Sequence, residues 1–167
     1  TINPAANFDS ETAYYIEISA SLVMDSGMNF SYAGISGSTT LNFTTKDIVD
    51  PTLASSTPAD NATGVEVGDD IVLTFSEAVN ASTGSIIIHD TSGGTVFETI
   101  AASSSQVTGT GTTTITINPS TNFASGTAYH VTIANNAFED TSSNAYAGIS
   151  GSTTLNFTAL STVIPNT

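Results

Sequence analysis

The chain has 167 residues, of which 39% are hydrophobic, and it carries 15 acidic residues against a single basic one, Lys46, for a formal net charge of −14. A phosphate-binding surface needs clustered Lys and Arg, so we expect neither a nucleic-acid partner nor attachment to anionic lipid. Cysteine is absent, which removes thiol chemistry and the usual zinc ligands, and no apolar run approaches the ~20 residues of a membrane-spanning helix.

The first elements along the chain belong to a segment that occurs twice. Residues 1–24 align with residues 116–139, where TINPAANFDSETAYYIEI stands against TINPSTNFASGTAYHVTI. After a one-residue slip, residues 32–44 and 146–158 are identical, and both read YAGISGSTTLNFT. Thirteen identical residues in a row do not arise by chance. The sequence therefore predicts tandem repeats with a period of 114 residues (146 − 32).

This period divides the chain into three parts. Residues 1–46 are expected to be the C-terminal half of one repeat, with its last three strands. Residues 47–160 are expected to be a complete repeat, and residues 161–167 the start of the next linker or repeat. Because these limits cut through repeats, we expect the chain to be a piece of a longer array.

Strand patterns follow one another through the complete repeat, where apolar and polar residues alternate at the period of two that marks a half-buried strand. The expected strands cover residues 52–56, 71–75, 85–89, 95–100, 113–117, 127–133 and 153–158. The side chains expected to face inward are Ile71, Leu73, Phe75, Ile115, Ile117, Tyr129, Val131, Ile133, Leu155 and Phe157. Turns are expected at residues 58–64 and at Ser92–Gly94. Seven or so short strands over about 110 residues predict an all-β Greek-key sandwich.

Tyr129 stands near the start of an expected strand, directly after a turn that contains Gly126. This position is typical of a tyrosine corner, in which the hydroxyl bonds back to the backbone of the preceding connection. Tyr14 holds the same position in the first copy. The alternative is an ordinary core aromatic, and in both cases the role of Tyr14 and Tyr129 is structural.

Two stretches carry a family resemblance. Residues 56–67, STPADNATGVEV, and residues 71–79, IVLTFSEAV, resemble the bacterial Ig-like repeats of S-layer proteins and giant adhesins, and GTAYHVTI and NAYAGISGSTTLNFT are similar to the same family. The resemblance covers the complete repeat, with residues 1–46 as a half copy. It implies an immunoglobulin-like sandwich in a secreted protein at the bacterial cell surface, as an adhesin stalk, an extender or a surface layer. It implies no catalytic residues, and it makes neighbouring repeats the expected partners.

Calcium is the ligand that the acidic residues favour most. In an Ig-like sandwich, the loops after the second and sixth strands lie at the amino-terminal end, and the loop between the fifth and sixth strands lies at the opposite end. The joint between two repeats is therefore expected to gather Asp9, Glu11, Asp47, Asp50, Glu77, Glu139 and Asp140. Such carboxylates repel one another unless a cation or water separates them, and Ca²⁺ takes several oxygens of this kind. We expect an inter-repeat calcium ion, against the alternative of a solvated acidic linker. A weaker second set is Asp60, Glu66, Asp69 and Asp70.

The expected function is that of a structural spacer, and a second hypothesis is direct binding of a glycan, a host surface or ice by the repeat itself. The long loop 134–152 is the candidate for glycan or protein contact. Between residues 108 and 116, Thr occupies every second position, so an extended strand would present one threonine face. A solvent-exposed edge strand explains the same pattern, because β-branched residues favour strands.

A third hypothesis is a self-assembling extracellular filament. Residues 1–46 supply only the last three strands of a sandwich and leave their apolar side chains without a covering sheet. These side chains are Ile2, Phe8, Ile16, Ile18, Leu41 and Phe43. A lone half sandwich is not expected to be stable. Preceding chain is the plainer cover, and strand complementation by an identical subunit is the alternative.

An enzyme is not expected. His89 next to Asp90 is the one acid–base pairing in the sequence, but a catalytic site needs a convergent nucleophile and base in a pocket. His89 ends an expected strand beside a Gly-Gly turn, and His130 stands where the first copy has Tyr15. Both histidines are therefore expected at the surface.

Overall fold

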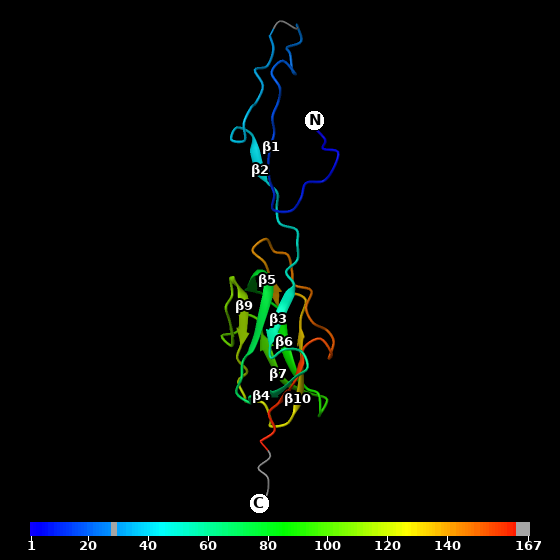
Figure 1. Ribbon diagram of the computed structural model, residues 1–167, viewed down its shortest axis with the longest axis vertical. Helices are drawn as coiled ribbons and strands as arrows, with labels where there is room; N and C mark the ends of the chain where they lie inside the picture. Colours follow the sequence, from blue (N-terminus) through cyan, green and yellow to red (C-terminus); the bar gives the residue numbers. More distant parts are fainter. Residues whose placement is uncertain (28–29, 163–167) are drawn as a thin grey trace, which may run out of the picture. The chain divides into compact units, whose positions relative to one another are not determined.

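The computed structural model describes residues 1–27 and 30–162, and the chain divides into two compact units, Thr1–Val49 and Asp50–Thr167 (Figure 1). Every regular element of the described residues is a β-strand. None of these residues belongs to a helix with the length and hydropathy needed to span a bilayer. Residues 163–167, most of the segment expected to begin a further repeat, lie outside the described residues.

The second unit consists of two sheets packed face to face. The first sheet has the order β4 (Ala62–Val65), β12 (Asn156–Ala159), β10 (Ala128–Ile133), β6 (Ser85–Asp90), β7 (Thr95–Ala101). The second has the order β11 (Phe138–Glu139), β5 (Ile71–Ala81), β9 (Thr112–Ile117), β8 (Val107–Thr108), and β3 (Leu53–Thr57) also pairs with β5. The predicted all-β sandwich is therefore confirmed.

The core lies between these sheets and is built from alternate residues of their central strands. All the side chains that the sequence placed inward are buried, from Ile71, Leu73 and Phe75 in β5 to Leu155 and Phe157 beside and in β12. Ile86 and Ile88 of β6 add to the same core. Fully burying one such side chain contributes about 1.5–3 kcal/mol, so burial on this scale holds the two sheets together.

The structure adds three short strands to those expected. The turn predicted over residues 58–64 ends earlier, because β4 begins at Ala62 and pairs with β12. β11 forms within the long loop 134–152 and pairs with β5. β8 pairs with β9, so that Thr108 lies opposite Thr116.

Residues 108–116 therefore do not form one continuous extended strand. The chain reverses direction between β8 and β9, where Gly109 and Gly111 have φ angles of 90° and 80°. Such values are open to glycine at little steric cost. Alternation at a period of two predicts a strand but does not reveal a reversal of chain direction within the alternating stretch. Here Gly109 and Gly111 allow that reversal.

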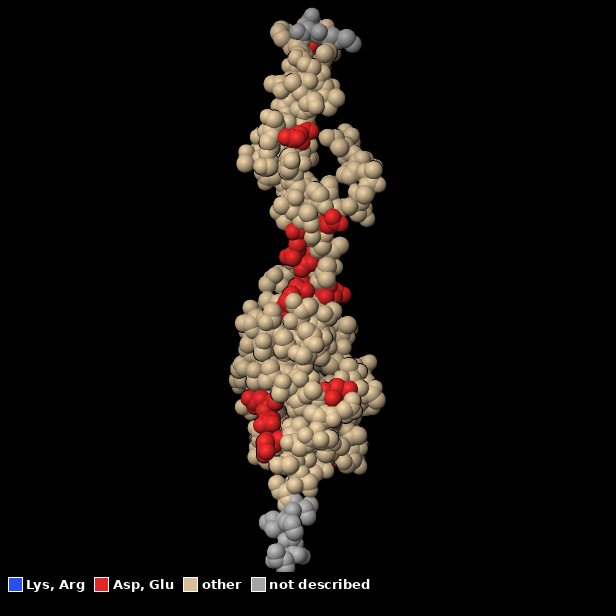
Figure 2. Space-filling view, in the orientation of Figure 1, with Lys and Arg blue, Asp and Glu red and all other residues tan. Residues whose placement is uncertain are grey.

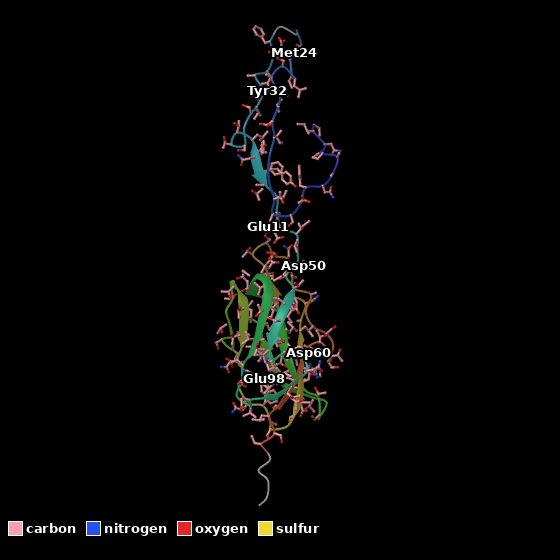
Figure 3. The ribbon with its side chains drawn as sticks, viewed as in Figure 1. Glu11, Met24, Tyr32, Asp50, Asp60 and Glu98 are labelled. Atoms are coloured by element: carbon pink, nitrogen blue, oxygen red, sulfur yellow. The ribbon has the colours of Figure 1, made fainter. Side chains whose placement is uncertain are left out.

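The first unit is built from β1 (Ala13–Tyr15) and β2 (Asn42–Thr44), which pair antiparallel with Tyr14 opposite Phe43. An isolated bridge between Ile18 and Ile35 continues this pairing. Figure 3 labels Met24 and Tyr32, which lie in the stretch of the first unit between its two strands. The two strands are thus the ends of one long irregular hairpin.

Candidate functional site

A tyrosine hydroxyl fixes the turn before β10 in the second unit. The backbone N–H of Ala124 donates a hydrogen bond of 2.8 Å to the hydroxyl oxygen of Tyr129. The Tyr129 ring stacks on Phe157, with centroids 5.7 Å apart, and meets Phe123 at 4.9 Å. A hydroxyl that bonds to the backbone a few residues upstream is the geometry of a tyrosine corner.

The first unit has the same arrangement at the matching positions. The N–H of Asp9 donates to the hydroxyl of Tyr14 at 2.9 Å. Tyr14 stacks on Phe43 with centroids 5.8 Å apart, and Phe8 meets Tyr14 at 4.6 Å. Tyr14 opposite Phe43 also repeats the strand register of Tyr129 opposite Phe157. The same residues therefore build the same local structure in both units.

The two units differ in how deeply these aromatic side chains are buried. Phe123 is 4% exposed and Phe157 is 1% exposed, whereas Phe8 is 44% exposed and Phe43 is 36% exposed. Leu41 and Tyr32 are likewise exposed, although Leu155 and Tyr146 are buried. The first unit thus has an open apolar face, whose contacting rings are Phe8, Tyr14 and Phe43.

Three of the seven acidic residues predicted to bind calcium lie in the first unit and contact its turns. Asp9 approaches the Tyr14 hydroxyl with its Oδ2 at 3.4 Å. Glu11, labelled in Figure 3, lies in the turn before β1 with φ of 47°. Asp47 accepts hydrogen bonds of 2.9 Å from the Ser10 hydroxyl and from the Val49 N–H. These contacts order the ends of the first unit.

The other four, Asp50, Glu77, Glu139 and Asp140, lie in the second unit, where the fold brings Glu77 and Asp140 together. Glu77 lies in β5 and Asp140 directly follows β11, which pairs with β5. One carboxylate oxygen of Glu77 and one of Asp140 lie within 4.8 Å of each other. At this separation two unit charges repel by a few kcal/mol at an effective dielectric constant of about 20.

The loop around Asp140 is held by this buried carboxylate. Its Oδ1 accepts hydrogen bonds from the N–H groups of Ser142 and Asn144, at 2.7 and 2.8 Å, and its Oδ2 accepts one from the Asn144 side-chain amide at 2.7 Å. The position of Asp140 beside Glu77 is therefore fixed by the loop as well as by the strand pairing. Whether these residues bind calcium stays a prediction.

In the weaker acidic set at the other end of the second unit, the carboxylates of Asp60 and Asp69 accept hydrogen bonds. Asp69 accepts the N–H of Glu66 at 3.2 Å, and Asp60 accepts both the N–H and the side-chain amide of Asn156, at 3.1 and 2.7 Å. Figure 2 shows the acidic residues as red groups on a largely tan surface, with no blue on this face. Asp60 therefore ties the turn before β4 to β12, and Asp69 holds a turn of its own.

The two histidines form a cross-strand pair between β6 and β10. Their rings are stacked, with centroids 4.4 Å apart and an interplanar angle of 4°. His89 contacts the Thr132 hydroxyl at 3.0 Å and His130 contacts the Thr91 hydroxyl at 2.9 Å. Burial, and then the neighbouring His89, lower the pKa of His130 from its usual 6.5. The Asp90 carboxylate accepts a hydrogen bond from the N–H of Gly93. In a catalytic triad, the carboxylate would instead orient a histidine ring.

The sequence does not reveal that β4 pairs with the last strand, β12. β4 and β12 run parallel, with Phe157 opposite Ala62 and Thr158 opposite Thr63. Two backbone hydrogen bonds flank them, from Asn61 N–H to the Asn156 oxygen at 2.8 Å and from Leu160 N–H to the Val65 oxygen at 2.7 Å. The turn-forming residues after Pro58 predict a turn over residues 58–64, where the structure has β4.

Comparisons with known proteins agree with this fold. The family model of the bacterial Ig-like domain matches residues 47–159, which assigns the chain a domain type of bacterial surface and extracellular proteins. A comparison with curated proteins finds no match. Among solved structures, CopC from Methylosinus trichosporium OB3b is 13% identical, with a TM-score of 0.47, over 70% of this chain and 99% of that chain. A likeness of this size carries no argument about ligands.

Proposed function

Because the chain belongs to the family of bacterial Ig-like domains, we propose that it is a structural, non-catalytic repeat segment of a secreted bacterial surface protein. The role is that of an adhesin stalk, an extender or a surface layer. Its task is to hold its two chain ends apart under load, and the side chains of its core serve stability. Neighbouring repeats are its partners.

The observation that carries this proposal is the parallel pairing of β4 with β12. β12 is the last strand of the sandwich, and β4 is the second, after β3, which pairs with β5. Beyond β3, the chain enters β4 and leaves β12 at opposite ends of the parallel pair. A force on the chain ends therefore shears the pair along its length and loads its hydrogen bonds together. An antiparallel terminal pair would instead open one bond at a time.

Calcium binding is the second part of the proposal. Glu77 and Asp140 have carboxylate oxygens within 4.8 Å of each other, in a chain whose one basic residue is Lys46. A Ca²⁺ ion takes carboxylate and backbone oxygens and would offset this repulsion. The remaining acidic residues of the predicted set stay candidates for its other ligands.

Single-molecule force spectroscopy tests the mechanical role. Pulled by its ends, the chain should unfold its sandwich in one step that releases roughly 35 nm, at up to about 3.6 Å per residue. Thr63→Pro places a residue without an N–H in the middle of β4 and should lower the unfolding force by about half, since proline cannot donate to a ladder. The matched control is Thr108→Pro in β8, an edge strand away from the terminal pair, which should leave the force unchanged.

Equal forces for both variants would contradict a load-bearing role for the β4–β12 pair. The calcium proposal has a separate readout, which is the melting temperature with and without Ca²⁺. A ligand that binds the folded state alone raises the stability by about 2.7 kcal/mol at 100 times its dissociation constant. If the Glu77→Gln variant keeps the full calcium-dependent shift in melting temperature, Glu77 is not a calcium ligand.

A further inference from the structure

The open apolar face of the first unit matches a face that is covered in the second unit. In the complete sandwich, Phe97 of β7 lies against Phe123 and Tyr129, with centroids 5.7 and 5.1 Å apart. The N–H of Phe123 donates to the Val67 oxygen at 2.8 Å. The cover over this face thus comes from residues that precede the repeated segment.

The strand edges of the first unit are open where the second unit has partners. β10 pairs with β6 on one side, and β12 pairs with β4 on the other. In the first unit, β1 and β2 pair with each other alone among the described strands. A surface pocket lies at the matching place in each unit. In the second unit, Ser85, Ile87 and His89 of β6 line one side of the pocket, and none of the described residues lines that side of the pocket in the first unit.

The inward-facing residues of the two copies are nearly the same. Phe8, Tyr14, Ile18, Leu41 and Phe43 match Phe123, Tyr129, Ile133, Leu155 and Phe157. The changes at buried positions are Ile16 for Val131, Leu22 for Ala137 and Val23 for Phe138. The outward positions differ more, with Tyr15 for His130 and Glu17 for Thr132. The face of the first unit therefore keeps the shape that fits a first half repeat.

We propose that the open face of the first unit is a docking surface for a polypeptide with the sequence of a first half repeat, here residues 50–117. The docked segment completes the sandwich by strand addition on both edges of the first unit. Transferring the pairing of the second unit gives the register: Tyr15 lies opposite the residue matching His89, and Phe43 lies opposite the residue matching Ala62.

This occupant fits better than a second copy of the chain. In the second unit, residues 50–117 already lie against β10 and β12, and their inward side chains, such as Ile86, Ile88 and Ile115, are buried there. A second copy would have to open its own sandwich to offer them. A first half repeat that has no second half of its own exposes the same side chains and has no sandwich of its own to open before docking.

Disulfide trapping tests the register, because the chain has no cysteine of its own. The full chain with Tyr15→Cys is mixed with a separate polypeptide of residues 50–118 that carries His89→Cys. Cross-strand neighbours lie within the Cα distance that a disulfide allows, so a cross-linked 1:1 complex is expected. The matched control is Ile87→Cys, two residues along the same face, which should cross-link at least ten times more slowly.

A second measurement guards against a polypeptide that aggregates. Residues 50–115 are joined directly before Thr1, which matches Thr116 in the repeat, and hydrogen exchange is followed by mass spectrometry. The proposal expects at least 100-fold slower exchange around Tyr14–Ile18 and Leu41–Thr44, and Phe43→Asp should abolish this protection. Absence of both the cross-link and the protection would overturn the proposal. A cysteine-free chain that sediments alone as a dimer with this face protected would also overturn it.

Discussion

The two units contain the same segment in two different settings. The strand register, the tyrosine hydroxyl bond and the ring-to-ring distances agree between them, as Tyr14 with Phe43 and Tyr129 with Phe157 show. Burial does not agree, because only the second unit has the covering strands. Local structure therefore resides in the repeated segment itself, and stability comes from the strands that precede it.

Truncating one matched phenylalanine in each unit should give the largest difference in unfolding free energy between the two units. Phe157→Ala removes a buried ring and should cost about 3–5 kcal/mol of unfolding free energy. Phe43→Ala removes a ring that is 36% exposed and should cost under about 1 kcal/mol. Urea unfolding followed by circular dichroism measures both. Similar losses would mean that the first unit has a core of its own.

The matched glycines should give the next largest effect. Gly148 and Gly34 have φ angles of 80° and 87°, and a Cβ at either would meet a carbonyl oxygen, that of Ile133 or Ile18. Gly148→Ala should destabilise the second unit by about 1–3 kcal/mol, as strained backbone does. Gly34→Ala should leave that transition in place and change only amide exchange around Ile18. If Gly34→Ala shifts the main unfolding transition, the unfolding of the first unit is coupled to that of the second.

Removing one tyrosine hydroxyl in each unit should give a smaller difference in stability. Tyr129→Phe leaves the Ala124 N–H without its partner and should cost about 1–2 kcal/mol, as a lost hydrogen bond in a partly buried site does. Tyr14→Phe should cost less, since water reaches the Asp9 N–H. Chemical denaturation gives the first value and hydrogen exchange at Asp9 gives the second. A larger loss of stability for Tyr14→Phe than for Tyr129→Phe would contradict the view that the Tyr129 hydroxyl bond is the better shielded from water.

The smallest effect concerns pH. The pKa of His130 is lowered in the folded state from 6.5, by burial and then by His89, so the unfolded chain binds more protons below that value. Stability should be unaffected above pH 6.5 and should fall as the pH drops from 6.5 towards the folded pKa. His130→Tyr, which copies Tyr15 of the first unit, should flatten this part of the profile. Thermal melts between pH 7.5 and 5.5 measure it, and an unchanged slope would exclude His130 as the cause.

Much of the fold could be predicted because the signal was local. Alternation placed Ile71, Leu73 and Phe75 inward without knowledge of any partner, and the repeat showed that Tyr14 and Tyr129 hold equivalent positions. The β8–β9 reversal was missed because glycine interrupts the threonine pattern, and β4 was missed because it follows a proline turn.

The candidate site was harder to predict, because its residues meet through long-range pairing. Glu77 and Asp140 come close only after β11 pairs with β5, and a two-residue strand inside a long loop leaves no periodic signal. Charge alone suggested seven residues with equal weight. Pairing selects among them, and pairing is a property of the folded chain.

The parallel closure by β4 and β12 also sets the order in which an exported chain can mature. Ala62 and Phe157 are 95 positions apart (157 − 62), and contacts between distant residues form late because loop closure comes first. A chain that emerges from its amino end holds the β4 edge and half of its core in water until the last strand has crossed. In the array of near-identical repeats proposed above, the last strand of a neighbour would compete for that edge during the interval, and the speed of translocation would then govern correct pairing.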